Sequence, residues 1–121
     1  MISKEEFYLL KSLLKTKGLL NVKILSGSMS PLIREGDTIE IEPVIHALKF
    51  GDIIVFLEQG VFNCHVFLKY LSDSKTQVLT MGLSSSVVDI PVDVENIIGI
   101  SQKIKKPFWY WLLLYYRILK L

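Results

Sequence analysis

The chain has 121 residues, a length that favours a single domain with its own hydrophobic core. Its one cysteine, Cys64, excludes an internal disulfide, and its place in an apolar run predicts a buried thiol. Five of the 14 lysines and arginines lie in residues 101–121, which contain no acid, so residues 1–100 carry nine basic and twelve acidic side chains. A basic, aromatic-rich end on a mildly acidic body is typical of contact with anionic membranes. Nucleic-acid binding is not expected, because no helix-turn-helix, zinc-finger or RNA-binding motif is present.

The first predicted element is an amphipathic helix over residues 3–16. Ser3 and Glu6 have the spacing of a capping box at its start, and Gly18 is a stop signal after its end. Apolar residues recur between them at helical spacing, and we expect this face to pack on the body of the protein. The charged residues distributed along residues 1–20 are not those of a secretory signal peptide.

The middle of the chain predicts six short strands separated by turns. Apolar and β-branched residues cluster in runs that Gly-Asp pairs and other turn residues bound. The predicted strands are residues 21–25, 38–43, 53–57, 61–71, 77–81 and 97–100. The run at 53–57 is apolar throughout and is expected to be buried on both faces. This pattern predicts a mainly β domain, either a sandwich or a partly open barrel, with one leading helix.

Residues 107–121 form a predicted element of another kind. They contain both tryptophans and three of the five tyrosines. As a helix they would be about 22 Å long, shorter than the roughly 30 Å hydrocarbon core of a bilayer, and they carry Arg117 and Lys120. Because Trp and Tyr favour the membrane interface, we expect peripheral contact with a membrane surface or a hydrophobic partner. The alternative is a helix packed on the body of the protein or in a dimer.

A serine-rich turn at residues 25–31 is the first candidate for chemistry. A serine hydroxyl is a weak nucleophile until a neighbouring base takes its proton. The chain has two histidines that are candidates for that base. His65 lies in the middle of a predicted strand, where its side chain would be held and half-buried, whereas His46 lies in a connector that is expected to be solvated.

A histidine base needs a carboxylate that holds its imidazole in one tautomer. Asp89, at the end of a second serine-rich stretch over residues 82–89, is one candidate. Asp73 and Asp93 are less constrained candidates. The residues alone do not choose among the three.

A series of short motifs follows the serine turn in a fixed order between residues 22 and 100. The motifs are Ser26-Gly27-Ser28-Met29-Ser30-Pro31, Gly36-Asp37, Gly51-Asp52-Ile53-Ile54-Val55-Phe56, a histidine in a strand, Leu79-Thr80-Met81-Gly82 and Ile97-Ile98-Gly99. Together they resemble the catalytic domain of type I signal peptidases. The resemblance depends on the combination, since each motif alone is weakly specific.

The resemblance implies a serine nucleophile with a histidine base. The serine before methionine is the nucleophile of that superfamily, which maps onto Ser28. Cys64-His65-Val66 resembles the endoplasmic-reticulum and spore-former type, in which a histidine, here His65, replaces the lysine of typical bacterial enzymes. The family's later aspartate maps onto Asp89, although the Lys-Gly-Asp-Asn-Asn segment before it is replaced by Met81-Gly82-Leu83-Ser84-Ser85-Ser86.

The resemblance also implies how a substrate is held. The oxyanion would be bound by the Ser28 backbone N–H and the Ser26 hydroxyl. Met29 would line an apolar surface for the substrate or fill the core. A peptide or preprotein would bind as an extended strand against an exposed sheet edge, and no metal or cofactor is implied. Lys69 is expected on the same strand face as His65, about 13 Å away and too far to share the serine.

The implied fold is a signal-peptidase/LexA-like complex β-fold, a coiled and partly open barrel of short strands with an N-terminal amphipathic helix and a C-terminal aromatic-rich helix. The predicted boundaries are residues 1–20 for the first helix, 21–104 for the catalytic β domain and 105–121 for the basic, aromatic segment. The implied function is a membrane-associated serine endopeptidase that cleaves an exported or secreted peptide precursor through an acyl-enzyme. The alternatives are a catalytically degenerate peptide-binding member of the fold and a repressor-type self-cleaving domain.

Overall fold

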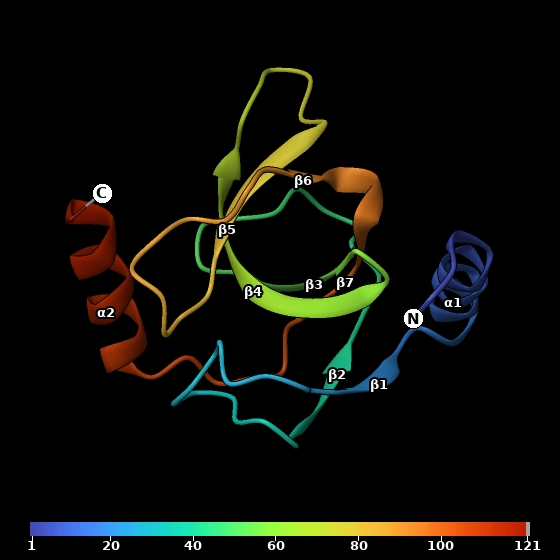
Figure 1. The fold of residues 1–121 in the computed structure, drawn as a ribbon, viewed down its shortest axis with the longest axis horizontal. Helices are drawn as coiled ribbons and strands as arrows, with labels where there is room; N and C mark the ends of the chain where they lie inside the picture. Colours follow the sequence, from blue (N-terminus) through green and yellow to red (C-terminus); the bar gives the residue numbers. More distant parts are fainter. Residues whose placement is uncertain (121) are drawn as a thin grey trace.

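The computed structural model describes residues 1–120 of the chain (Figure 1). Within them, seven strands and one 3₁₀ helix, η1, lie between two α-helices. The elements are, in order, α1 (Lys4–Lys17), β1 (Leu20–Lys23), β2 (Thr38–Ile41), β3 (Ile53–Glu58), β4 (Val61–Tyr70), β5 (Gln77–Met81), β6 (Val92–Asp93), η1 (Val94–Asn96), β7 (Ile97–Ser101) and α2 (Phe108–Leu119). The six predicted strands are all present, and β6 is an additional strand of two residues.

The strands form two antiparallel sheets. β1 and β2 make the smaller sheet, in which Leu20 lies opposite Ile41. The larger sheet has the order β6-β5-β4-β3-β7, and a bridge between Glu42 and Ile100 connects it to the end of β2. Within the described residues neither sheet closes on itself, and Figure 1 shows the long β4 curving across the middle of the molecule with one helix on each side. The predicted mainly β fold, partly open and with a helix at each end, is confirmed.

One hydrophobic cluster joins both sheets to both helices. It includes Phe7 and Leu14 from α1, Ile41 from β2, Ile53 from β3 and Leu114 from α2, each with an exposed fraction of 2 % or less. A second cluster packs on the other side of β3. The apolar run in this strand is therefore buried on both faces, as its sequence predicts.

The start and end of α1 follow from local chemistry. The Ser3 side chain accepts from the Glu6 backbone N–H and the Glu6 carboxylate accepts from the Ser3 N–H, which completes the predicted capping box. Gly18 ends the helix with a φ of +84°, a left-handed conformation that glycine adopts without a steric penalty. The packing of this helix on the body, through Phe7 and Leu14, is confirmed.

The C-terminal helix, α2, packs on the body through one face. Tyr110 and Leu114 are fully buried, and the Tyr110 hydroxyl donates to the Gly51 carbonyl at 2.7 Å. The Trp111 ring lies so close to Gly51 that an added Cβ would be 2.3 Å from it. The φ of Gly51 is +91°, a conformation that residues with a side chain rarely adopt. Both the Trp111 ring and this backbone conformation therefore require glycine at position 51. None of the helices within residues 1–120 is long and apolar enough to cross a membrane.

A bulge in β4 corrects one expectation about Lys69. The register of β4 against β5 shifts between Phe67 and Lys69, so that Lys69 lies opposite Leu79 and Tyr70 lies opposite Val78. Tyr70, not Lys69, therefore shares the face of His65, and its ring contacts the Phe67 ring at a centroid distance of 5.0 Å. The prediction for Lys69, which assumed strict alternation of side chains between the two faces of β4, was wrong because the bulge inserts one extra residue.

Tyr110→Phe tests how α2 is held. The substitution removes only the hydroxyl that binds the Gly51 carbonyl, which then stays buried without a partner. The free energy of unfolding, measured by urea denaturation, should fall by about 1–3 kcal/mol. Tyr115→Phe is the matched control, because the Tyr115 side chain is 55 % exposed, and its unfolding midpoint should stay close to wild type. Equal stability of the two variants would contradict the prediction.

Candidate active site

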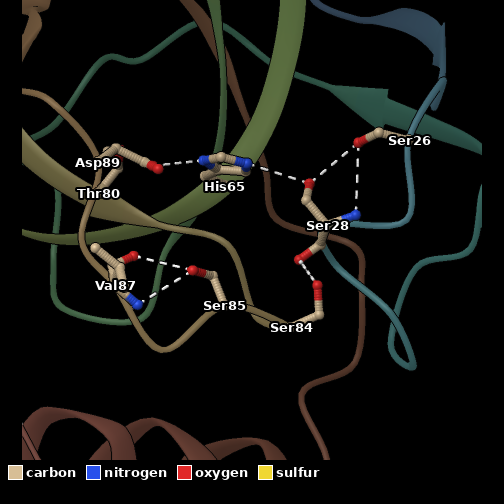
Figure 2. Close-up of polar contacts among 8 residues, drawn as sticks. All are labelled: Ser26, Ser28, His65, Thr80, Ser84, Ser85, Val87 and Asp89. Atoms are coloured by element: carbon tan, nitrogen blue, oxygen red, sulfur yellow. Dashed lines mark hydrogen bonds and ion pairs between the residues drawn. The ribbon is translucent and has the colours of Figure 1, made fainter.

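Ser28, His65 and Asp89 lie in one hydrogen-bonded row (Figure 2). His65 Nε2 is 3.1 Å from Ser28 Oγ, and His65 Nδ1 is 2.5 Å from Asp89 Oδ2. A carboxylate only accepts hydrogen bonds, so the imidazole proton is assigned to Nδ1. Nε2 then carries the lone pair that accepts the Ser28 hydroxyl proton. This is the arrangement of a nucleophile, a base and a group that orients the base.

The three residues come from separate parts of the fold. Ser28 belongs to the turn after β1, His65 lies in the middle of β4, and Asp89 ends the loop of residues 82–89 that follows β5. The site is half-buried, with the His65 and Asp89 side chains 15 % and 25 % exposed. The Phe56 ring meets the imidazole edge-to-face at a centroid distance of 5.7 Å. Partial burial lowers the local dielectric and strengthens these bonds, while Ser28 stays reachable from solvent.

Thr80 is a site residue to which the sequence alone assigned no role. Its hydroxyl donates to Asp89 Oδ2 at 2.7 Å, and its carbonyl accepts from the Asp89 backbone N–H at 2.9 Å. Oδ2 therefore receives hydrogen bonds from both Thr80 and His65. The Thr80 side chain is fully buried on β5. A hydroxyl between Leu79 and Met81, at an inward position of the strand, was the one signal available in the sequence, because a buried polar group requires a partner.

The loop of residues 82–89 also holds the serine turn. The Ser84 backbone N–H and hydroxyl both donate to the Ser28 carbonyl, at 2.9 Å and 3.0 Å. Gly82 permits this approach, because an added Cβ would be 3.0 Å from the Ser28 carbonyl oxygen and 3.5 Å from His65 Nε2. One short loop therefore contacts both ends of the row, through Ser84 at Ser28 and through Asp89 at His65.

Ser26 lies beside Ser28. The two hydroxyl oxygens are 3.2 Å apart, and the Ser28 backbone N–H points to Ser26 Oγ at 3.5 Å (Figure 2). The Ser28 N–H and the Ser26 hydroxyl thus lie close together next to Ser28 Oγ. Donors in such a position can stabilise negative charge that develops on a bound carbonyl.

Other candidates from the sequence lie elsewhere. Met29 is fully buried in the core, so it does not line a surface; of the two roles expected for it, core filling is the one observed. His46 is exposed in the connector before β3. Asp93 accepts from the Gln77 amide at 3.0 Å in the β5–β6 pair, and Asp73 lies in the exposed β4–β5 turn. Among residues 1–120, no group of three or more His, Cys, Asp or Glu side chains has a metal-binding geometry.

Cys64 precedes His65 but lies in the hydrophobic core, as predicted. Its burial raises the pKa of the thiol to about 12. The thiolate is the nucleophilic form of cysteine, so Cys64 stays an unreactive thiol at neutral pH. Ser28 is therefore the nucleophile candidate next to the histidine.

The amino-acid sequence matches the family described as Peptidase S24-like over residues 2–101. The chain belongs to the Peptidase S24-like family. No curated protein matches it. Serine peptidases and self-cleaving repressors both occur in the S24-like family, within the LexA/signal peptidase superfamily. The superfamily part of the predicted resemblance is thereby confirmed, and the S24-like segment contains Ser28, His65 and Asp89 but ends before α2.

Thr80→Val tests whether Thr80 orients the carboxylate. Valine keeps the shape of threonine but cannot donate to Asp89. A hydrogen bond to a charged group contributes about 1.5–3 kcal/mol, so the rate at which Ser28 reacts with a fluorophosphonate probe, displacing fluoride to form a phosphonate ester, should fall roughly ten- to hundredfold. Thr80→Ser retains the hydroxyl and should label at close to the wild-type rate, and urea denaturation of both variants shows that they are folded. Equal labelling rates in Thr80→Val and Thr80→Ser would refute the role.

Proposed function

We propose that the protein is a serine endopeptidase of the signal-peptidase type. The hydrogen-bonded row of Ser28, His65 and Asp89 is the observation that carries this proposal. Ser28 Oγ attacks the carbonyl carbon of the scissile peptide bond as its proton passes to His65 Nε2. Asp89, bonded to Nδ1, stabilises the imidazolium ion that results.

The remaining steps use the same groups. The tetrahedral intermediate carries its negative oxygen next to the Ser28 N–H and the Ser26 hydroxyl. His65 gives its proton to the leaving amine, the C–N bond breaks, and an ester to Ser28 remains. A water molecule then attacks this acyl-enzyme while Nε2 takes its proton. As the second intermediate collapses, its C–O bond to Ser28 breaks and His65 Nε2 gives the proton to Ser28 Oγ, which releases the carboxyl product and restores the Ser28 hydroxyl.

A groove between β1 and the first half of β4, which the start of the chain and α1 also line, is the proposed substrate site. A cavity of about 500 Å³ lies there, and its lining is mostly apolar. The lining side chains include Leu20, Val22, Leu25, Phe62 and Ile98. A cavity of this size holds several side chains of an extended peptide.

Backbone groups on both sides of the groove support the binding of an extended strand. Within the described residues β1 pairs with β2 alone. The pairing of β4 with β5 begins at Val66, so residues 61–65 pair only with β3. Each of these two strands therefore has one edge without a neighbour, and such edges recruit peptides as an added strand. Both strands lead toward the site, β1 to Ser28 and β4 to His65.

Covalent labelling of Ser28 tests the catalytic proposal. A fluorophosphonate probe should label the wild-type protein, should not label Ser28→Ala, and should label His65→Ala at least about a thousandfold more slowly. His46→Ala and Ser86→Ala are matched controls, because both side chains are exposed and lie outside the row. Labelling that is absent in the wild type, or that survives in Ser28→Ala, would rule out the enzyme and leave the degenerate peptide-binding member of the fold.

Leu25→Asp tests the groove separately from the chemistry. Leu25 is 68 % exposed at the groove, so the substitution should place a charge in the substrate path without affecting the core. For an extended apolar peptide, KM should rise about tenfold or more, while the rate of labelling by the small probe should not change. Leu9→Asp is the control, because Leu9 is 71 % exposed on α1 and does not line the groove. A KM that is unchanged in Leu25→Asp would place the substrate elsewhere.

Release of peptides from the protein's own chain during the same assay would indicate the self-cleaving alternative.

A further inference from the structure

The exposed apolar side chains of α2 all lie on one face of the helix. At about 100° per residue, they fall within a sector of roughly 120°. Their exposed fractions range from 40 % to 87 % for Phe108, Trp109, Leu112, Tyr115, Tyr116 and Leu119. Four of the six are aromatic. We call this set the outer face of α2.

The opposite side of the helix is already occupied, so the outer face cannot turn inward. Tyr110 and Leu114 are buried in the main core cluster, and the Tyr110 hydroxyl is bonded to the body. Arg117 donates from Nη1 to the Ser85 carbonyl, one turn further along. These contacts fix the rotation of α2 about its axis, and they leave a continuous apolar surface facing solvent.

The exposed charged residues that flank α2 along the chain are positive. Lys105 is exposed just before the helix and Lys120 is exposed at its end. Among the described residues neither forms an ion pair, whereas Lys103 is paired with Glu40 at 2.7 Å and Lys106 approaches Asp52 at 3.8 Å. The Lys120 Nζ lies 5.1 Å from the centre of the Tyr116 ring. An aromatic stripe with a cation at each end and no acid in residues 101–121 complements an anionic surface.

We infer that the outer face of α2 docks into the interface of an anionic membrane, with the helix lying along the surface. Tryptophan and tyrosine are enriched at that depth, and cations at the two ends of the helix attract anionic headgroups. A second copy of the chain fits less well. Two such faces in contact would bring Lys105 and Lys120 together with no acid from residues 101–121 to pair them.

Docking through α2 also sets the position of the candidate active site relative to the lipid. The helix holds the loop of residues 82–89 through the bond from Arg117 to Ser85, and this loop carries Ser84 and Asp89. Peptide bonds close to the membrane surface are then the ones within reach of Ser28, a consequence that rests on the proposed function. The docking itself does not depend on it.

Vesicle binding tests the inference. The full chain should bind phosphatidylcholine vesicles that contain about 30 % phosphatidylglycerol, and high salt or vesicles of phosphatidylcholine alone should weaken the binding. The double variant Leu112→Asp/Leu119→Asp should bind at least about tenfold less well, because both exposed side chains enter the interface. Leu9→Asp/Ile45→Asp is the matched control, since Leu9 and Ile45 are 71 % and 75 % exposed on other parts of the surface. It should bind as the wild type does.

A charge variant and two further measurements complete the test. Lys105→Gln/Lys120→Gln should lose roughly thirtyfold in affinity for the anionic vesicles, at about fivefold per lysine. Labelling of Ser28 by the fluorophosphonate probe should be equal in all of these variants, so a failure of docking is distinguished from a failure of the proposed enzyme. The inference is overturned if the wild type ignores anionic vesicles, if the outer-face variant binds them equally well, or if sedimentation shows that the outer face instead joins two copies.

Discussion

The hydrogen bond between His65 Nδ1 and Asp89 Oδ2 is the interaction on which the candidate site depends. It places the imidazole proton on Nδ1, and only then can Nε2 accept from Ser28. Asp89 is itself held by the buried Thr80 hydroxyl and by its own backbone bond to β5. A carboxylate with two donors on one oxygen and a bonded backbone has little freedom to turn away. The rigidity of the site therefore derives from β5 as much as from β4.

The serine side of the site depends on the hydrophobic core. Met29 follows Ser28 directly and is fully buried, so it anchors the serine turn to the cluster that joins the two sheets. Ser84 holds the carbonyl of Ser28 from the other direction. Because the turn is fixed on both sides, the position of Ser28 Oγ relative to β4 follows from the packing of the two sheets. Met29, which was predicted to contact the substrate or fill the core, thus contributes by positioning Ser28.

Local signals in the sequence predicted the helices and strands, whereas the resemblance of the motifs to a known family predicted the grouping of Ser28, His65 and Asp89. The capping box, the stop glycine and the apolar run of β3 act over a few residues, so their structural outcomes could be predicted without the fold. The grouping of Ser28, His65 and Asp89, which are 37 and 24 residues apart along the chain, was accessible only through the order of the motifs. The residues alone left three aspartates open.

Features that arise from tertiary contacts escaped prediction. The bulge that moves Lys69 off the face of His65 is a property of the register between β4 and β5, and nothing in the residues of β4 marks it. The Thr80 bond needs the loop after β5 to fold back on that strand. For α2, the sequence left two alternatives open, contact with a membrane or partner and packing on the body. The structure shows that one side packs on the body and the other is exposed. A helix that is mostly apolar on all sides has no polar face from which its rotation can be inferred.

The contact between Arg117 and Ser85 connects an element outside the S24-like segment to the loop on which the site depends. Placing a guanidinium group in a half-buried position costs free energy unless its donors find acceptors. Here one donor binds a backbone carbonyl of the loop, and Nε has no partner among the described residues. An apolar side chain at this position would bury area without that cost, but apolar contact is non-directional and would let the loop slide along α2. A directional bond holds the backbone of Ser85 at one place, between the two loop residues that contact Ser28 and His65. An arginine at position 117 is therefore explained better by its role in fixing the loop of residues 82–89 than by its contribution to the stability of α2.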